Sequence, residues 1–428
     1  MWRWIGCRPD YAAPEETCIM RMQEAAGQQE KTRILHILPI PILPLIGPCL
    51  RTLRQSRGAL RNGCEVAVLC RKGGRGKNSE EAFLRDAPLF RDIVTLPDLP
   101  TFPVIAVREI MHLMFSWRVI LRTIRRFRPD VVHVHNYPVT IAFVTTIICS
   151  LKRLPVVLDV HDGWYESFSS IPADSLAQRL YFAVGLFFEK ISLRYCSAII
   201  TVSEALKKSI REREAKATCG KPFDVMRNVD PRDLLAADPG AHAEENILVY
   251  SGVLYFPYIG LEDLMDIMPH LHQRLGLKLV VIGDGPYRKK FEAYAAAHDL
   301  KGIVEFTGHI GRNRLHAWVS RAKLCVIPFQ KNVQLDVAVP NKLFEYMAFG
   351  KAIVYPDLSG FSEIFGASTE GRFSAGDKRD LQNVIDALAS NDALRRRIGQ
   401  ANRKLLEQFS FEREYQKLQS IYLRVLRT

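Results

Sequence analysis

Lys342 and Glu345 stand in the first turns of a short helix that the sequence predicts over residues 340–350. Pro340 suits the mouth of a helix, and Gly350 suits the left-handed residue just past its end. The unpaired N–H groups and the positive dipole end of the first turn attract phosphate, and Lys342 reinforces this attraction. The Glu345 carboxylate, one turn further, can accept hydrogen bonds from two neighbouring hydroxyl groups such as those of a ribose. The alternative is a solvated helix with an ordinary Lys and Glu on its outer face.

A second group of polar residues follows two buried strands of the N-terminal half. The strand predicted over residues 155–160 ends at His161 and Asp162, and an earlier strand carries His133 and His135 on one face. Ligands bind outside the carboxyl ends of strands in open α/β sheets. The His161–Asp162 pair suits acid–base chemistry, metal binding or sugar binding, whereas His133 and His135 also suit a plain core. Metal binding is the weakest interpretation, because no third and fourth ligands stand at a recognisable spacing.

The elements that must position these groups alternate between strand and helix. Residues 33–39 form an apolar run, a basic helix is predicted from about Leu50 to Arg61, and a second strand follows at residues 65–69. This βαβ pattern is typical of nucleotide-binding α/β domains. The loop that contains Gly47 lacks the G-x-G-x-x-G spacing, so an NAD fingerprint is not supported. The glycine-rich stretch 73–78 also lacks the Walker spacing, which predicts a flexible basic loop.

The alternation restarts in the C-terminal half, where several predicted strands end in glycine. The residues at these strand ends are Gly252, Gly283 with Gly285, and Gly308 with His309. Glycine lets a backbone approach a ligand closely, but at a strand-to-helix turn it is often only a steric requirement. The polar stretch 230–245, broken by Pro231, Pro239 and Gly240, predicts a linker between the two halves.

Length and composition favour a folded protein of about two domains. The chain has 428 residues, of which 48% are hydrophobic and 25% charged, as expected for a globular protein. Its net charge of +13 predicts attraction to nucleic acid, a phospholipid surface or phosphorylated small molecules. No recognition motif supports nucleic-acid binding. The nine cysteines form no C-x-x-C pair, which favours reduced thiols over a disulfide framework or a zinc site.

The expected location is the cytoplasm, because no segment has the roughly 18 uncharged apolar residues of a membrane span. Residues 1–31 carry no signal-peptide core and are expected to be poorly structured. The helix predicted over residues 104–127 is amphipathic and ends in arginines, so it suits the interface of an anionic membrane. An ordinary core helix with cations favoured at its C-terminus is the competing interpretation.

Residues 340–350 and the strand-like 351–355 resemble the donor-site signature of the family 4 retaining glycosyltransferases, in the subgroup that reads P-N-K-L-F-E-Y-M. Similarity to this family extends over roughly residues 246–360, and the segments 197–204 and 226–230 resemble two further motifs. The resemblance implies an α/β fold of GT-B type, with two Rossmann-like domains facing across a cleft and a C-terminal helix returning to the first domain. Together with the composition of the chain, it predicts a disordered extension at 1–31, an acceptor-side domain at 32–235, a linker at 236–245, a nucleotide-sugar-binding domain at 246–410, and the returning helix at 411–428.

The resemblance also implies roles for single residues. Glu345 would hold the ribose, His161 would contact the transferred sugar, and Lys342 would bind the diphosphate, so these three are the predicted catalytic residues. Donor binding is predicted for Gly47, Gly252, Gly283, Gly285, Gly308, His309, Asn341, Lys342, Leu343 and Glu345. No metal or other cofactor is expected, because the helix N-terminus and Lys342 can neutralise the growing charge of the diphosphate.

Two features of many family members are missing from this chain. Those members carry a carboxylate eight residues before the ribose Glu, where this chain has Val337, with Asp336 one position early. They also carry an Arg and a Lys near the first glycine turn of the second domain, and residues 252–260 contain neither. The departures move the predicted phosphate contacts to Lys342, Lys331 and the helix N-terminus.

The expected reaction is transfer of a sugar from a nucleotide diphosphate sugar to a hydroxyl group with retention of configuration. The expected acceptor is a polyprenyl-diphosphate-linked or surface-polysaccharide saccharide, which would place the protein peripherally on the inner face of a membrane. A soluble acceptor stays open as the alternative. Two other functions stay open. A sugar-nucleotide epimerase could share the architecture, and a binding protein without catalysis would explain the missing groups.

Overall fold

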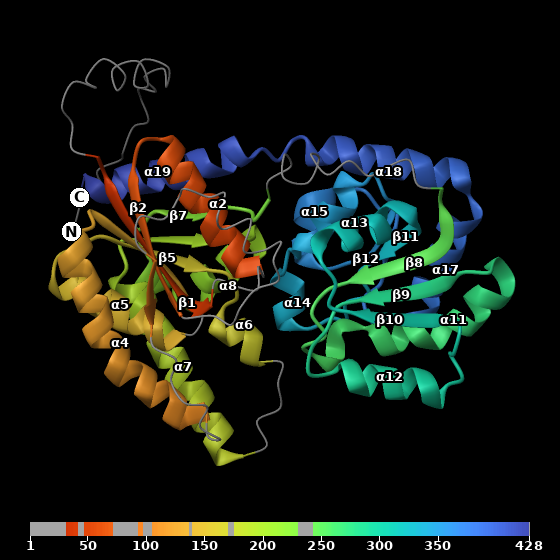
Figure 1. Ribbon diagram of the computed structural model, residues 1–428, viewed down its shortest axis with the longest axis horizontal. Helices are drawn as coiled ribbons and strands as arrows, with labels where there is room; N and C mark the ends of the chain where they lie inside the picture. Colours follow the sequence, from red (N-terminus) through yellow and green to blue (C-terminus); the bar gives the residue numbers. More distant parts are fainter. Residues whose placement is uncertain are drawn as a thin grey trace, which may run out of the picture.

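The computed structural model describes residues 31–41, 47–71, 93–96, 105–136, 139–169, 175–229 and 243–427. Figure 1 shows two α/β domains side by side, and a long helical segment at the C-terminal end of the chain that runs across both. The predicted fold class, GT-B with two Rossmann-like domains, is confirmed. The predicted extension 1–31, apart from Lys31, and the basic loop 73–78 lie outside the described residues.

The described part of the N-terminal domain contains one parallel sheet with the strand order β3-β2-β1-β4-β5-β6-β7. Its strands are β1 (Arg33–Pro41), β2 (Glu65–Arg71), β3 (Ile93–Leu96), β4 (Val131–His135), β5 (Val156–Val160), β6 (Ala198–Thr201) and β7 (Phe223–Val225). Its helices are α2 (Gly47–Arg61), α4 (Ile105–Phe127), α5 (Val139–Leu151), α6 (Trp164–Ser169), α7 (Leu176–Tyr195), α8 (Glu204–Arg213) and α9 (Ala215–Thr218).

The C-terminal domain contains a second parallel sheet with the order β10-β9-β8-β11-β12-β13. Its strands are β8 (Glu245–Ser251), β9 (Lys278–Ile282), β10 (Val304–Gly308), β11 (Ala322–Val326), β12 (Ile353–Pro356) and β13 (Arg372–Phe373). Its helices are the 3-10 helix η1 (Pro257–Ile259), α11 (Leu261–Leu275), α12 (Arg288–Ala297), α13 (Arg312–Arg321), α14 (Val333–Val337), α15 (Asn341–Ala348), α16 (Ser359–Phe365), α17 (Lys378–Ser390) and α18 (Asp392–Leu406). Of the predicted linker 236–245, only residues from 243 onward are described.

The C-terminal helix α19 (Phe411–Leu426) returns to the N-terminal domain, as predicted. Alternation along β1 sends Leu35 and Ile37 to the face covered by α4 and α5, and Ile34 to the opposite face. On that opposite face α19 packs beside α2. Gly58 of α2 is necessary for this contact, because a Cβ at this position would lie only 2.1 Å from the Tyr415 ring.

Direct hydrogen bonds join the two domains. Ser203 caps α8 by accepting from the Leu206 N–H at 3.0 Å, and its hydroxyl donates to the Val337 carbonyl of α14 at 2.6 Å. The Glu363 carboxylate of the C-terminal domain accepts from the Glu204 N–H at 2.9 Å, so it also satisfies the first turn of α8. The start of α8 is therefore held by side chains of both domains.

Helix α4 matches the competing interpretation of residues 104–127 over its C-terminal half. Ile120 and Ile124 are buried against the sheet, as in an ordinary core helix. Phe115 and Trp117 are 44% and 37% exposed. No helix within the described ranges is long and apolar enough to cross a bilayer.

Candidate functional site

The candidate site lies between the domains, where the start of α2 meets the start of α15. A Cβ on Gly47, the first residue of α2, would lie 2.9 Å from Asn341 Nδ2. Asn228 Nδ2 donates to the Gly47 carbonyl at 3.0 Å, and Arg54 Nη1 donates to the Asn228 carbonyl at 3.0 Å. Two helix N-termini with their positive dipole ends therefore lie close together, one from each domain.

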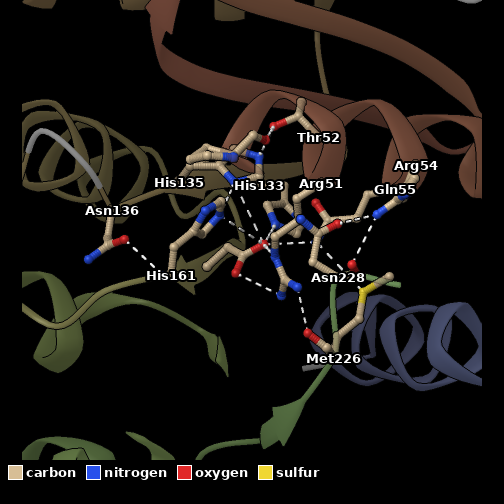
Figure 2. Close-up of polar contacts among 12 residues, drawn as sticks. Arg51, Thr52, Arg54, Gln55, His133, His135, Asn136, His161, Met226 and Asn228 are labelled. Atoms are coloured by element: carbon tan, nitrogen blue, oxygen red, sulfur yellow. Dashed lines mark hydrogen bonds and ion pairs between the residues drawn. The ribbon is translucent and has the colours of Figure 1, made fainter. Parts of the chain in front are cut away.

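On the N-terminal side, the carboxylate of Asp159 lies at the centre of a buried polar cluster, most of which Figure 2 labels. It accepts from Arg51 Nε at 2.8 Å and from Arg51 Nη2 at 3.0 Å. It also accepts from Gln55 Nε2 at 2.8 Å and from His133 Nε2 at 3.2 Å. The side chains of Arg51 and Asp159 are 1% and 0% exposed, so this is a fully buried ion pair.

The register of the sheet explains how these residues meet. His36 of β1 lies opposite His133 of β4, and His135 of β4 lies opposite Asp159 of β5. Because side chains alternate along a strand, all four point to the face that α2 covers. On α2, Arg51 and Gln55 are separated by four residues, which places both on the side facing the sheet.

The His133 ring is fixed by hydrogen bonds at both nitrogens. Its Nδ1 lies 2.6 Å from the Tyr422 hydroxyl of α19, and its Nε2 lies 3.2 Å from the Asp159 carboxylate. Because an ionised carboxylate can only accept, His133 Nε2 carries the proton and Nδ1 accepts from Tyr422. The returning helix therefore takes part in the cluster.

His161 is tied to the same cluster through His135. Its Nε2 lies 2.8 Å from His135 Nδ1, and His135 Nε2 lies 2.9 Å from the Thr52 hydroxyl. The Thr52 hydroxyl donates to the Pro48 carbonyl at 3.0 Å, so its oxygen accepts from His135 and His135 in turn accepts from His161. The side chain of His161 is 10% exposed. This arrangement leaves Nδ1 as the ring nitrogen of His161 that can accept from a sugar hydroxyl.

Burial and neighbouring charges set the protonation of the cluster. Burial lowers the pKa values of His36, His133 and His135, so these imidazoles are neutral at pH 7. Burial alone would raise the pKa of Asp159, but Arg51 and the neighbouring histidines outweigh it and hold this pKa well below its usual range. The cluster therefore contains one fixed negative charge and one fixed positive charge among neutral rings.

Two triplets of side chains bring possible metal ligands within 4.8 Å of one another, namely His36–His133–His135 and His135–Asp159–His161. Sequence spacing did not reveal them, because the pairing of β1, β4 and β5 brings them together. A cation in either triplet would have to break hydrogen bonds of His133 or His135. Next to Asp159 it would also meet the guanidinium of Arg51, which repels positive charge. The arrangement thus favours a hydrogen-bonded cluster over a metal centre.

On the C-terminal side, neighbouring strands end in glycines whose backbones touch. Gly283 has φ +147°, and a Cβ there would lie 1.8 Å from the Gly252 carbonyl oxygen. Gly285 has φ +158°, and a Cβ there would lie 2.4 Å from the Leu254 carbonyl oxygen. The Gly283 N–H donates to the Gly308 carbonyl at 3.1 Å. These glycines are therefore required by packing, and their predicted role in donor binding stays a prediction.

Lys342 lies beneath the Gly252 turn. Its Nζ is 3.9 Å from the centroid of the Tyr250 ring and 5.2 Å from that of Phe329. Aromatic faces attract a cation, but burial lowers the pKa of Lys342 to about 7, with Glu345 acting in the opposite direction. An anionic group bound beside Lys342 would restore its full positive charge.

Glu345, one turn further along α15, lies in the field of arginines from both domains. Burial raises its pKa, whereas Arg312 of α13, Arg54 of α2 and Lys342 lower it. Arg54 belongs to the N-terminal domain, so the carboxylate of Glu345 faces the space between the domains. This position suits a hydroxyl-bearing ligand held between them.

Neither Val337 nor the neighbouring Asp336 provides the carboxylate that many family members carry eight residues before the ribose Glu. Val337 is buried and packs with the N-terminal core. Asp336 accepts from the Ser359 N–H at 3.1 Å and from the Ser359 hydroxyl at 2.9 Å, so it is engaged at the start of α16. The family feature is therefore absent at this place in both sequence and structure.

The remaining predicted residues, Leu343, His309 and Lys331, differ in their burial. Leu343 is fully buried, and its N–H donates to the Pro340 carbonyl at 3.0 Å, so it contributes to packing and to the first turn of α15. His309 and Lys331 are exposed. Sequence reasoning missed the parts played by Arg51, Arg54 and Arg312. The basic character of the helix near Leu50–Arg61 was a signal for Arg51 and Arg54.

Comparisons with known proteins agree with this fold. A family model described as "Glycosyltransferase Family 4" matches residues 50–218, and one described as "Glycosyl transferases group 1" matches residues 245–391. A glycogen synthase of Mycobacterium tuberculosis is 25% identical over 310 residues, which cover 71% of this chain and 70% of that protein. Anabaena HepE, solved in complex with UDP and glucose, has a TM-score of 0.66 at 16% sequence identity. The match covers 91% of this chain and 98% of the HepE chain. WaaG, a glycosyltransferase involved in lipopolysaccharide biosynthesis, has a TM-score of 0.65 at 14% identity and covers 91% of this chain and 99% of its own.

Proposed function

Because this chain is a glycosyltransferase of the GT-B fold, we propose that it transfers a sugar from a nucleotide diphosphate sugar to a hydroxyl group with retention of configuration. The observation that carries the proposal is the meeting of two helix N-termini, at Gly47 and Asn341, beside Lys342 and Glu345. HepE was solved with UDP and glucose, which supports a nucleotide sugar as the donor.

The diphosphate would bind between these helix N-termini. As the bond to the sugar breaks, negative charge grows on the departing diphosphate and must be neutralised. The N–H groups of α2 and α15 can do this together with Lys342. With a pKa of about 7, Lys342 is only partly charged in the free protein and becomes fully charged beside the diphosphate. In this proposal the reaction needs no metal ion.

The ribose would bind to Glu345. Its carboxylate can accept from both ribose hydroxyls, and Arg312 and Arg54 favour its ionised form. Because Arg54 comes from the N-terminal domain, a bound donor would interact with both domains at once. His161 would accept from a hydroxyl of the transferred sugar through Nδ1, while Nε2 stays bonded to His135.

For the acceptor we propose a lipid-linked saccharide of surface-polysaccharide assembly, used at the cytoplasmic face of a membrane. WaaG takes part in lipopolysaccharide biosynthesis and shares this fold. The net charge of +13 is also suited to a diphosphate-linked lipid or an anionic membrane. Retention itself is supported by the likeness of residues 340–350 to the retaining family.

Donor binding tests this function first. Saturation-transfer NMR with UDP-, GDP-, dTDP- and ADP-sugars should identify one preferred nucleotide. Glu345→Gln should weaken its binding by about 10- to 100-fold, since hydrogen bonds to charged groups contribute about 1.5–3 kcal/mol. Glu407→Gln, an exposed position at the end of α18, is the matched control and should bind as the wild type does. Donor binding that is absent, or indifferent to Glu345, would contradict the proposed site.

Product analysis tests the reaction. With the preferred donor and a polyprenyl-diphosphate-linked saccharide, proton NMR of the product should show the same anomeric configuration as the donor. An inverted product would contradict the retaining mechanism. Conversion of the donor sugar without any acceptor would instead favour an epimerase of the same fold.

A further inference from the structure

Helix α7 carries an exposed apolar stripe on the N-terminal domain. Leu176, Leu180, Val184 and Phe187 are 82%, 63%, 40% and 56% exposed. Their three- and four-residue spacing places them along one side of the helix. These four residues are called the α7 stripe below. Exposed apolar groups that form a contiguous patch mark an interaction surface, whereas scattered ones do not.

The opposite side of α7 is firmly packed, which fixes the stripe toward the outside. Phe188 stacks on Phe143 of α5 with ring centroids 4.4 Å apart. A Cβ on Gly185 would lie 2.0 Å from the Trp164 ring, so α6 lies directly against the helix. Glu189 is buried, accepts from the Trp164 N–H at 2.6 Å and pairs with Arg213 Nη1 at 2.8 Å. The helix cannot turn its stripe inward without breaking these contacts.

Exposed cations gather toward the C-terminal ends of α7 and of α4 and α5, which pack on the same face of the sheet. Exposed examples are Arg122 and Arg125 of α4, Lys152 and Arg153 after α5, and Lys190 and Arg194 of α7. Among the described side chains of these three helices the only acid is Glu189, which is buried in its pair with Arg213. Trp117 and Phe115 of α4 add two partly exposed aromatic rings. Among the described residues, α4, α5 and α7 therefore present apolar and cationic groups and no exposed acid, whereas the exposed acids Glu204 and Glu212 on this side of the sheet belong to α8.

This combination fits one partner best. Apolar side chains flanked by lysines and arginines insert at the boundary between headgroups and acyl chains, and the cations attract anionic lipid. A two-fold contact between copies of this chain would bring the same cations face to face, which is unfavourable. We propose that the α7 stripe, together with the cations at the C-terminal ends of α4, α5 and α7, docks this protein on an anionic phospholipid bilayer.

The location of the stripe fits the proposed reaction. The biological purpose of this docking rests on that proposed function. In Figure 1 the starts of α4 and α7 reach the lower edge of the N-terminal domain. Helix α6 begins at Trp164, soon after His161, and precedes α7 in the chain. It also contacts α14 of the C-terminal domain. Helix α6 therefore lies close to both His161 and the C-terminal domain and packs against α7, so an acceptor held in the bilayer could approach from this side.

Vesicle flotation of the full chain tests the surface. The wild type should float with phosphatidylcholine–phosphatidylglycerol vesicles at low salt and much less with phosphatidylcholine alone. Leu176→Ser with Leu180→Ser should reduce binding at least about tenfold, because several methylene groups no longer leave water. Lys190→Gln with Arg194→Gln should also weaken it and reduce its dependence on salt. The matched controls are Leu426→Ser and Lys404→Gln. Leu426 is a partly exposed leucine on α19, and Lys404 is an exposed lysine on α18.

The outcomes separate this proposal from the proposed function. All altered side chains are exposed, so thermal unfolding and donor binding by NMR should match the wild type. Vesicle binding that is absent in the wild type, or unchanged in the leucine variant, would overturn the docking surface. So would a leucine variant that changes from dimer to monomer in light scattering while still floating, because a second copy would then cover the stripe. Failure of donor binding with intact flotation would overturn the proposed function alone.

Discussion

The two sides of the site are built in different ways. On the N-terminal side, Asp159 accepts hydrogen bonds from Arg51, Gln55 and His133 within a buried cluster. On the C-terminal side, Lys342 and Glu345 form no salt bridge with any residue that the structure describes, and burial disfavours the charge of each. The charges of the N-terminal side are therefore already paired within the protein, as in a structural scaffold. Those of Lys342 and Glu345 would gain their partners from a bound ligand. Substitutions within the buried Asp159 cluster should therefore act on stability, and those at Lys342 and Glu345 on binding.

Replacing the central carboxylate should have the largest effect. Asp159→Asn leaves the buried guanidinium of Arg51 without its counter-charge, and removing one partner of a buried ion pair costs about 3–5 kcal/mol. The free energy of unfolding from urea titration should fall by this amount. The double variant Arg51→Met with Asp159→Leu should recover much of the loss, because no charge then stays buried. A loss below about 1 kcal/mol in the single variant would show that the scaffold description is wrong.

Lys342 should affect donor binding and its pH dependence. Its pKa of about 7 in the free protein rises when a diphosphate binds. Donor affinity should therefore be level below about pH 7 and decrease above it, because binding must then take up a proton. Calorimetry at alkaline pH in buffers of different ionisation enthalpy measures this uptake. Lys342→Met should lose roughly tenfold in affinity, about one charge-assisted hydrogen bond, and show no uptake. Equal uptake in both proteins would contradict the assignment.

His36 should affect stability mainly in acid. It stacks on His133 with centroids 4.6 Å apart, and neither ring nitrogen has a partner within the described ranges. Burial lowers its pKa, so below about pH 6.5 the unfolded chain takes up a proton that the folded protein does not. Stability must therefore fall as pH falls, by up to about 1.4 kcal/mol per pH unit for each such histidine.

His36→Phe should remove one of these contributions. Urea titrations at successive pH values should show a shallower decline than in the wild type. His298→Gln, at the exposed C-terminal end of α12, is the matched control for replacing a histidine. An identical slope for His36→Phe would mean that this histidine takes up its proton in the folded protein.

Gly47→Ala should have the smallest effect. It should change only the space between the starts of α2 and α15. The added methyl group would lie 2.9 Å from Asn341 Nδ2, the end of a side chain that can move, so stability should change by less than about 1 kcal/mol. Donor binding or turnover should still decrease severalfold, since the methyl group stands between the two helix starts. Gly311→Ala at the start of α13 has open space around it and is the control. Unchanged kinetics would separate Gly47 from the donor site.

The sequence by itself determined several elements, including the helix that carries Lys342 and Glu345 and the returning C-terminal helix. The helix predicted at residues 340–350 is α15 (Asn341–Ala348), and Gly350 closes it with φ +60°. The returning helix predicted at 411–428 is α19. These features depend on periodicity, caps and glycines that lie close together in the chain, so a single stretch contains the whole signal.

Only the tertiary structure decided the rest. Arg51 and Asp159 are more than one hundred residues apart in the chain, and strand register brings them together. Arg54 lowers the pKa of Glu345 electrostatically, and it can do so only because the two domains meet. The same holds for α7, whose Leu176 and Leu180 have the spacing of core residues but lie in solvent. Helical periodicity shows that a face is apolar, and only the packing of its neighbours shows whether that face is covered.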